Sequence, residues 1–368
     1  MEDIAVGLRE KLSAGAQILS PGSDGYAQAT ERWSVLDAPS INIVVVPSTE
    51  NDVAETVKHA NSLNIPFSQD GKTAKIGGGT LSKTITHSLW AQEKQTGTLL
   101  GPGLSGGHGF LQGRHGLVSD QFVSMNIVLA DGELRTIDKE SDLWWAMQGA
   151  GHNFGIVTSV TSKIYDVEHR DWAYASFPVY IINYSFFYND PTLDPDNPLI
   201  MFFILQEGAS VVDSIYTKPF HRLGPLASDA AGVYDLFASA TKITPALNGS
   251  LFPFEGYSLQ GVKAVPNDHT AFPNRAGNLL VSSLLTYAPN STALDKTAAD
   301  LGKSLRQILY EGSGQKELYT YVNYAFGDET ENNWYEYEQW CHDRLKALKR
   351  KYDPLGKFSF YAPIAYIQ

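Results

Sequence analysis

The chain has 368 residues, of which 43% are hydrophobic and 18% charged, so it can bury a large core and is expected to form two domains. Its 40 acidic and 28 basic residues give a net charge of −12, which disfavours nucleic-acid and membrane-surface partners because both are anionic. The single cysteine, Cys341, excludes an internal disulfide and a cysteine zinc site. We see no signal peptide and no apolar run of about 20 residues, so we expect an intracellular protein that does not span a membrane.

The first part of the chain predicts two strand–helix units. Ile41 to Val46 is a β-branched run and predicts a strand. Thr49 and Asp52 form a helix-capping pattern at the start of a helix that reaches Leu63, and a strand follows at Ile65–Phe67. The second unit has a strand at 73–76 and a helix at 81–95.

The next elements lie between two glycine clusters and after the second. Met125 to Leu129 predicts a strand, and the turn at 130–133 leads into a partner strand at 134–137. A short helix is expected at 142–147 and a strand at 155–160.

The remainder of the chain divides into an irregular part and a regular end. From 171 to 318 we predict aromatic strands such as Leu199–Leu205 and one helix at 293–310. From Trp334 to Tyr352, apolar residues recur every three or four positions and predict one long amphipathic helix that ends before Pro354.

The first glycine cluster matches three motifs whose chemistry differs. Residues 101–106 match G-x-G-x-x-G, the dinucleotide pattern, and residues 103–107 match G-x-S-x-G, the hydrolase nucleophile pattern with Ser105. Both motifs need a helix directly afterwards, and the glycines that follow disfavour one. His108, His115, His152 and Asp120 could be read as a metal cluster, but their spacing places them on no common face, so we predict no metal.

A further interpretation combines residues 101–109 with the second cluster, residues 149–155. Both clusters lie at predicted strand ends of one domain. Two glycine-rich loops can surround a diphosphate with backbone N–H groups, without a helix dipole.

Several motifs in the same order resemble the berberine-bridge-enzyme-like FAD-linked oxidoreductases, and especially their fungal members. They are Leu104–Asp120, Ala130-Asp131-Gly132, Leu143–Ser159, Tyr321–Tyr324, Trp334-Tyr335 and Lys351–Phe358. The resemblance covers nearly the whole chain. It implies an α+β fold with a two-part, PCMH-type FAD-binding domain and a substrate domain of antiparallel sheet covered by helices. The implied domains are 1–168 for FAD, 169–318 for substrate and 319–368 as a C-terminal element that returns to the FAD domain.

The resemblance also implies the site. Tyr324 matches the family's catalytic tyrosine, with Asn323 and Tyr321 beside it. The residues implied to bind FAD are Pro102, Gly103, Ser105, Gly106, Gly107, His108, Gly109, His115, Gly116, Leu117, Asp120, Gly151, Asn153, Gly155, Ile156, Val157 and Asn323. The implied reaction is oxidation of a hydrophobic small molecule in fungal secondary metabolism, with hydride transfer to flavin N5 and reoxidation by oxygen.

The sequence departs from the family where FAD is covalently attached. The family's histidine loop is missing where Phe67 runs directly into Ser68–Lys72, and no cysteine stands near Gly97-Thr98. Ser105–Gly109 spells the attachment motif, but its flanks belong to the second FAD loop, so we do not expect His108 to be an anchor. Three explanations are open: the protein has lost these segments, the sequence omits residues that the protein contains, or the gene model is wrong.

These breaks limit what the resemblance implies about activity. FAD, if bound, is expected to be non-covalent. A flavin-independent cyclase or an inactive binding protein on the same fold stays an alternative.

Overall fold

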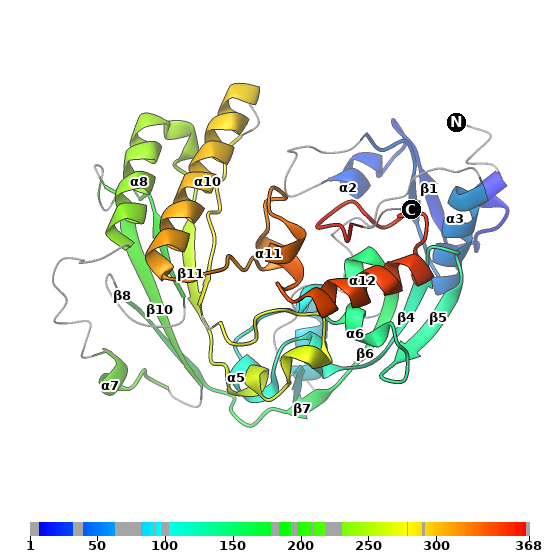
Figure 1. Cartoon of the computed structure of the whole chain (residues 1–368), viewed down its shortest axis with the longest axis horizontal. Helices are drawn as coiled ribbons and strands as arrows, with labels where there is room; N and C mark the ends of the chain where they lie inside the picture. Colours follow the sequence, from blue (N-terminus) through cyan, green and yellow to red (C-terminus); the bar gives the residue numbers. More distant parts are fainter. Residues whose placement is uncertain are drawn as a thin grey trace. The chain divides into compact units, whose positions relative to one another are not determined.

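The computed structural model describes residues 7–31, 40–62, 82–90, 93–96, 103–177, 184–190, 192, 194, 197–207, 210–217, 230–277, 279–288 and 291–365. The chain forms two compact units. Unit 1 contains Met1–Asp166, Ser258–Ala276 and Tyr319–Gln368, and unit 2 contains Val167–Tyr257 and Gly277–Leu318 (Figure 1). The sequence placed residues 258–276 in the middle domain, whereas the structure places them in unit 1.

Unit 1 is built on a three-stranded antiparallel sheet of order β5-β4-β6. Its strands are β4 (Phe122–Leu129), β5 (Leu134–Asp138) and β6 (Gly155–Ser162). Two small pairs accompany it: β1 (Gln17–Leu19) with β2 (Val44–Val46), and β3 (Lys94–Thr96) with β7 (Ile164–Asp166). The hairpin that the turn at 130–133 predicted between β4 and β5 is confirmed.

Both faces of the β5-β4-β6 sheet are covered. Alternate residues of β4 point to opposite sides, so the strand contributes to a core on each face. Met125, Ile127 and Leu129 belong to the larger core, with Leu345 and Leu348 of helix α12 (Gln339–Tyr352). On the other face, Val128 packs against Val53, Ala54 and Val57 of helix α3 (Glu50–Ser62). Burial on both sides explains the apolar run Ile127–Leu129 at the end of this strand.

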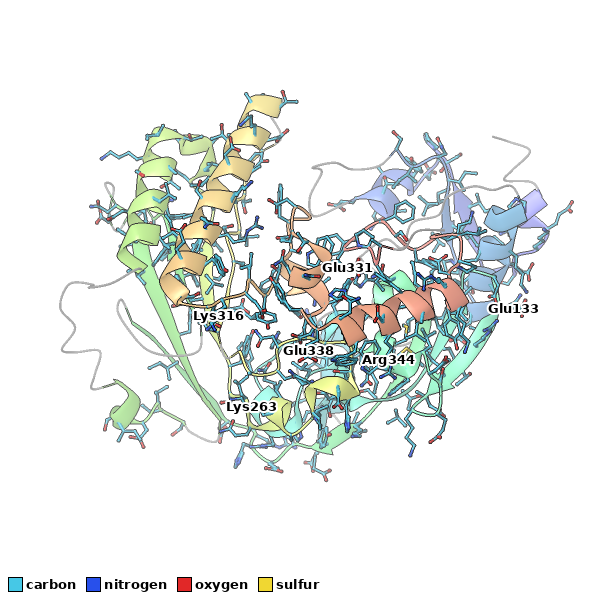
Figure 2. All side chains as sticks on the ribbon, viewed as in Figure 1. Glu133, Lys263, Lys316, Glu331, Glu338 and Arg344 are labelled. Atoms are coloured by element: carbon cyan, nitrogen blue, oxygen red, sulfur yellow. The ribbon has the colours of Figure 1, made fainter. Side chains whose placement is uncertain are left out.

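The remaining helical segments of unit 1 are short, and most lie in loops. They are α2 (Tyr26–Thr30), α4 (Ser82–Trp90), η1 (Gly103–Ser105), α5 (Gln112–His115), η2 (Ser119–Gln121), α6 (Trp144–Met147), η3 (Gly151–Asn153), α9 (Gln260–Lys263), η6 (Asn267–His269), η7 (Val322–Tyr324) and α11 (Glu331–Tyr335). Helix α12 carries Arg344 (Figure 2). Its guanidinium lies 4.3 Å from the ring centroid of Trp145 of α6.

Helix α3 begins as the sequence predicted. The Asp52 N–H donates to Thr49 Oγ1 at 3.2 Å, and the Thr49 N–H donates to Asp52 Oδ2 at 2.8 Å. These reciprocal bonds satisfy N–H groups that have no partner within the helix. The predicted strands at 65–67 and 73–76 lie outside the described residues.

Two predicted helices have different bounds. The helix predicted at 81–95 ends at Trp90, because Glu93 has φ 59 and Lys94–Thr96 pairs with β7 as a strand. The single helix predicted at 334–352 is divided into α11 and α12. Glu336 has φ 94, outside the helical region, so the helix cannot continue through it.

Unit 2 is a five-stranded antiparallel sheet of order β12-β11-β9-β10-β8. Its strands are β8 (Trp172–Phe177), β9 (Tyr184–Tyr188), β10 (Leu199–Glu207), β11 (Phe252–Gly256) and β12 (Leu279–Val281), and its helical segments are α7 (Ser214–Thr217), α8 (Ala230–Ile243), η5 (Pro245–Leu247) and α10 (Thr292–Ser313).

One face of this sheet is covered by α8 and α10, which lie side by side (Figure 1). Phe187 and Phe252 of the sheet pack with Phe237 of α8 and Leu305 of α10. The predicted α+β class, with an antiparallel sheet covered by helices, is therefore confirmed. Along the described residues, no helix is both long and apolar enough to span a membrane.

Candidate functional site

The first glycine cluster forms a tight turn in unit 1. Residues Gly103–Ser105 are a 3-10 turn, and Gly106 and Gly107 follow with φ of 97° and 84°. A Cβ added at Gly106 would lie 2.2 Å from the Phe272 ring, and one at Gly107 would lie 2.7 Å from Val118. Glycine is therefore required at both positions by backbone conformation and by close packing.

The structure brings the two glycine clusters together. The Gly149 N–H donates to the Leu104 carbonyl at 3.0 Å. Ser105 Oγ lies 3.5 Å from His152 Nδ1. The tight turn at Gly103–Gly107 and a second loop from a distant part of the sequence are thus adjacent, as the diphosphate interpretation requires.

Neither alternative motif has the structure that its chemistry needs. No helix opens after Ser105 or Gly106, since the next one, α5, begins only at Gln112. The second ring nitrogen of His152 faces Tyr335 Oη and Asn153 Nδ2, both at 3.0 Å, so no carboxylate orients this imidazole. Removal from water, together with the Lys349 charge, lowers the pKa of His152 to about 4.

His108 has a defined tautomer, set by Gln112. The Gln112 Oε1 accepts from the Gly109 N–H at 3.2 Å, and its Nε2 donates to the Ser258 carbonyl at 3.3 Å. This orientation makes His108 Nδ1, 2.8 Å from Oε1, the protonated nitrogen of the ring. Burial and the Arg275 charge lower the pKa of His108.

The four residues considered as a metal cluster have separate partners. His115 stacks on Tyr165 with ring centroids 3.9 Å apart, and His152 lies in the network with Ser105. In the part of the chain that the structure describes, no group of three or more His, Cys, Asp or Glu side chains could hold a metal ion.

Asp120 forms a buried ion pair with Arg275. Arg275 Nη1 and Nη2 donate to the two carboxylate oxygens at 2.9 and 2.8 Å, and the two side chains are 2% and 5% exposed. Asp120 Oδ2 also accepts from the Leu117 N–H at 2.9 Å. The carboxylate therefore fixes Ser258–Ala276, which we call the strap, against the first glycine loop.

The other residues predicted around Asp120 have packing roles. Leu117 is fully buried with Val262 and Phe272 of the strap. A Cβ at Gly116 would lie 2.7 Å from Asp120 Oδ2.

The residues of the second cluster lead into β6. A Cβ at Gly155 would lie 2.5 Å from the Val128 carbonyl oxygen, Val157 is in the larger core, and Ile156 packs against the α3 cluster. These contacts explain the residue types without a ligand.

Asn153 is held by the C-terminal tail. Its Oδ1 accepts from the Ile364 N–H at 3.1 Å, and its Nδ2 donates to Tyr335 Oη at 2.8 Å. The buried Lys349 Nζ donates to the Asn153 carbonyl at 2.6 Å and to Asp353 at 2.7 Å. The end of the chain therefore fixes the second glycine loop.

Of the predicted catalytic residues, Asn323 and Tyr324 lie on η7, and Tyr321 directly precedes it. Tyr321 contacts His108 and Tyr324 edge-on, with ring centroids 4.9 and 5.2 Å apart. Tyr324 is 44% exposed, so its side chain is accessible. Asn323 is on the same turn. Pro102 and the attachment positions Phe67–Lys72 and Gly97-Thr98 lie outside the described residues.

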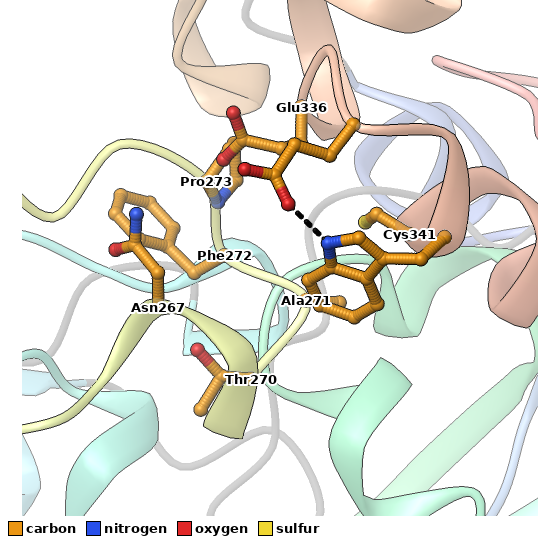
Figure 3. A pocket seen from close by; sticks show the side chains of 9 residues that line it. Asn267, Thr270, Ala271, Phe272, Pro273, Glu336 and Cys341 are labelled. Carbon is orange, nitrogen blue, oxygen red and sulfur yellow. Dashed lines mark hydrogen bonds between the residues drawn. The ribbon is translucent and has the colours of Figure 1, made fainter.

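A small pocket in unit 1 lies between the strap and the start of α12. Its volume is about 40 Å³, and its lining includes Phe272, Glu336, Trp340 and Cys341 (Figure 3). Trp340 Nε1 donates to Glu338 at its rim. It is far smaller than the several hundred Å³ that drug-sized ligands occupy, so we do not assign it to substrate or flavin.

The chain is 42% identical to the FAD-linked oxidoreductase chyH of Penicillium rubens, over 97% of this chain and 93% of the relative. The chain belongs to the FAD-linked oxidoreductase family. The FAD-linked oxidoreductase chry5 of Gibberella zeae is also 42% identical, over 97% of this chain and 94% of its own length. No protein-family model matches the chain.

The fold is that of berberine-bridge-enzyme-like proteins. The Physcomitrella patens BBE-like 1 structure has a TM-score of 0.70 with 18% identity, covering 99% of this chain and 100% of that one. The resemblance and the fold predicted from the sequence are therefore confirmed.

The alignment with the Penicillium rubens relative is longer than this chain. That alignment has 464 positions against 368 residues in this chain, so at least 96 positions have no residue here.

The residues present fit the phosphate part of a family cofactor. A right-handed turn at Gly103–Ser105 followed by positive φ at Gly106 and Gly107 is the kind of backbone that forms an anion-binding concavity. Ser119, whose N–H donates to the Gly106 carbonyl at 2.8 Å, has a buried hydroxyl with no hydrogen-bond partner among the described residues.

Sequence reasoning missed the residues that hold the loops. Arg275, Lys349 and Gln112 each also bind a group more than 140 positions away, namely Asp120, the Asn153 carbonyl and the Ser258 carbonyl, and no local pattern reports such contacts. The one available signal was an arginine shortly after the apolar residues Ala271–Pro273.

Proposed function

We propose that this chain is an oxidoreductase that binds FAD non-covalently and oxidises a hydrophobic, aromatic small molecule of fungal secondary metabolism. The observation that carries the proposal is the pair of adjacent glycine loops, in a chain 42% identical to FAD-linked oxidoreductases. The loops would bind a diphosphate through backbone N–H groups, because the two cations beside them, Arg275 and Lys349, are already paired with Asp120 and Asp353.

Ser105, Gly106, Gly107 and Gly151 are the residues that would hold the cofactor. FAD, when bound, accepts a hydride at N5 and returns the electrons to oxygen. The strap and the C-terminal tail keep the two loops in place through Arg275 and Lys349.

On the substrate side, we assign Tyr324 as the group that takes a proton from the substrate. Its side chain is accessible, and Tyr321, Phe272 and the neutral His108 supply an aromatic surface behind it. Such a surface favours flat, apolar molecules over anions.

Titration of the purified full chain with FAD tests the proposal. We expect saturable binding with a flavin absorbance band, and complete release of the flavin when the protein is denatured with acid. Release of the flavin is expected because neither side chain that could attach it is available. Cys341 is buried, which raises the pKa of its thiol to about 12, and His108 Nδ1 is hydrogen-bonded to Gln112. The absence of any bound flavin would overturn the proposal and favour a flavin-independent cyclase or a binding protein.

A Tyr324→Phe variant tests the assigned proton acceptor. We expect turnover to fall by about 10²- to 10⁴-fold, as for loss of a general base, while FAD binding is unchanged. A panel of hydrophobic phenols and alcohols is offered as substrates. Turnover is measured as the rate of hydrogen peroxide release. Unchanged turnover would remove Tyr324 from the site.

A further inference from the structure

Tyr361 of the C-terminal tail lies against the turn that carries Tyr324. Its hydroxyl lies 2.6 Å from the Val322 carbonyl oxygen and 2.8 Å from the Ala325 carbonyl oxygen. These two carbonyls flank Asn323 and Tyr324, so one phenolic proton is shared between the two sides of η7.

The tail that presents Tyr361 is itself fixed to the second glycine loop. The next residue, Ala362, has φ 38, which is unfavourable for a residue with a Cβ. Its carbonyl accepts from Tyr335 Oη and, at 3.3 Å, from Asn153 Nδ2. The unfavourable backbone is therefore held by hydrogen bonds from two other segments.

We propose that Tyr361 is a positioning residue that sets the placement of Tyr324 relative to the glycine loop at 151–155. The effect of Tyr361 on catalysis rests on the proposed function. The contact of Tyr361 with η7 would position Tyr324 in the same way for any reaction in which Tyr324 takes part. The connection runs from Asn153 through the Ala362 carbonyl to the Tyr361 hydroxyl and then to η7.

The Tyr361 hydroxyl remains a donor throughout the usual pH range. Partial burial of the Tyr361 side chain, which is 42% exposed, together with the Glu329 charge, raises the pKa of Tyr361 to about 12. Its ring lies 6.1 Å from that of His152, which adds a contact with the same loop. Loss of the hydroxyl alone should leave this ring contact and the fold intact.

The first test needs neither FAD nor substrate. In protein labelled with ¹³C at the tyrosine ζ carbon, the Tyr324 resonance is assigned by its loss in Tyr324→Phe. We expect Tyr361→Phe to shift or broaden that resonance while the melting temperature stays unchanged. The matched control is Tyr310→Phe, which also removes a hydroxyl bound to a backbone carbonyl, that of Lys316, in unit 2. An unmoved Tyr324 resonance in Tyr361→Phe would overturn the proposal.

The second test is a double-mutant cycle on turnover of the best substrate from the peroxide panel. We expect Tyr361→Phe to lower kcat about tenfold with little change in KM, and to have no further effect in Tyr324→Phe. Equal losses in both backgrounds would show that Tyr361 acts independently of Tyr324 and would overturn the proposal. If no substrate turns over, the proposed function fails, and the tyrosine resonance still decides the role of Tyr361.

Discussion

Replacing Arg275 by methionine removes the cation of the buried pair with Asp120 and leaves the carboxylate without its partner. The pair is 2% and 5% exposed, and Arg275 makes bonds of 2.8 Å to both Asp120 and Thr270. Breaking a buried pair from one side costs about 3–5 kcal/mol, since the remaining charge stays out of water. At about 1.4 kcal/mol per factor of ten, the unfolding equilibrium shifts by about two to three and a half orders of magnitude.

Urea unfolding followed by tryptophan fluorescence measures this loss, because every tryptophan except Trp172 falls within the ranges of unit 1. The matched control is Arg135→Met, which breaks a pair with Asp131 that is 44% and 47% exposed. We expect that control to cost less than about 1 kcal/mol.

A second change separates charge burial from lost packing. Adding Asp120→Asn to Arg275→Met removes the unpaired charge and keeps an oxygen for the Leu117 N–H, so we expect part of the stability to return. If Arg275→Met costs no more than Arg135→Met, the strap is not held by this pair and the reasoning is refuted.

Two further predictions concern the loops and their supports. Gly106→Ala should reduce FAD affinity at least about tenfold, whereas Gly22→Ala, with φ 90 but open space around its Cβ, should leave it unchanged in the same titration. At Asp52, burial favours protonation, but four hydrogen bonds from Ser13, Ser48 and Thr49 outweigh it and hold the pKa well below its ordinary value. Stability from Asp52 is therefore complete above about pH 4 and lost as the pH falls, and acid unfolding of Asp52→Asn should lack this loss; an identical acid profile in the variant would contradict it.

The elements that the sequence predicted well are those whose pattern is local. Burial of β4 on both faces follows directly from its apolar run Ile127–Leu129, and the Thr49–Asp52 bonds follow from the capping pattern. The helix predicted through Glu336 failed because periodicity reports the buried face but not a single residue with positive φ.

The site could be predicted in outline but not in detail. Glycine patterns identified the two loops, yet they could not show that Asp120 faces Arg275 or that Asn153 faces the tail. Each of these contacts joins residues more than 150 positions apart. A local pattern does not specify such partners, and the return of the strap to unit 1 depends on them.

We propose that the chain performs flavin-dependent oxidation although its sequence departs from the family where FAD is covalently attached. Anaerobic mixing of the FAD-loaded protein with the panel of hydrophobic phenols and alcohols tests it most directly. We predict that the flavin absorbance bleaches on addition of substrate and recovers when oxygen is admitted. A product isomeric with its substrate, formed without bleaching, would contradict the claim and indicate a non-redox enzyme on this fold.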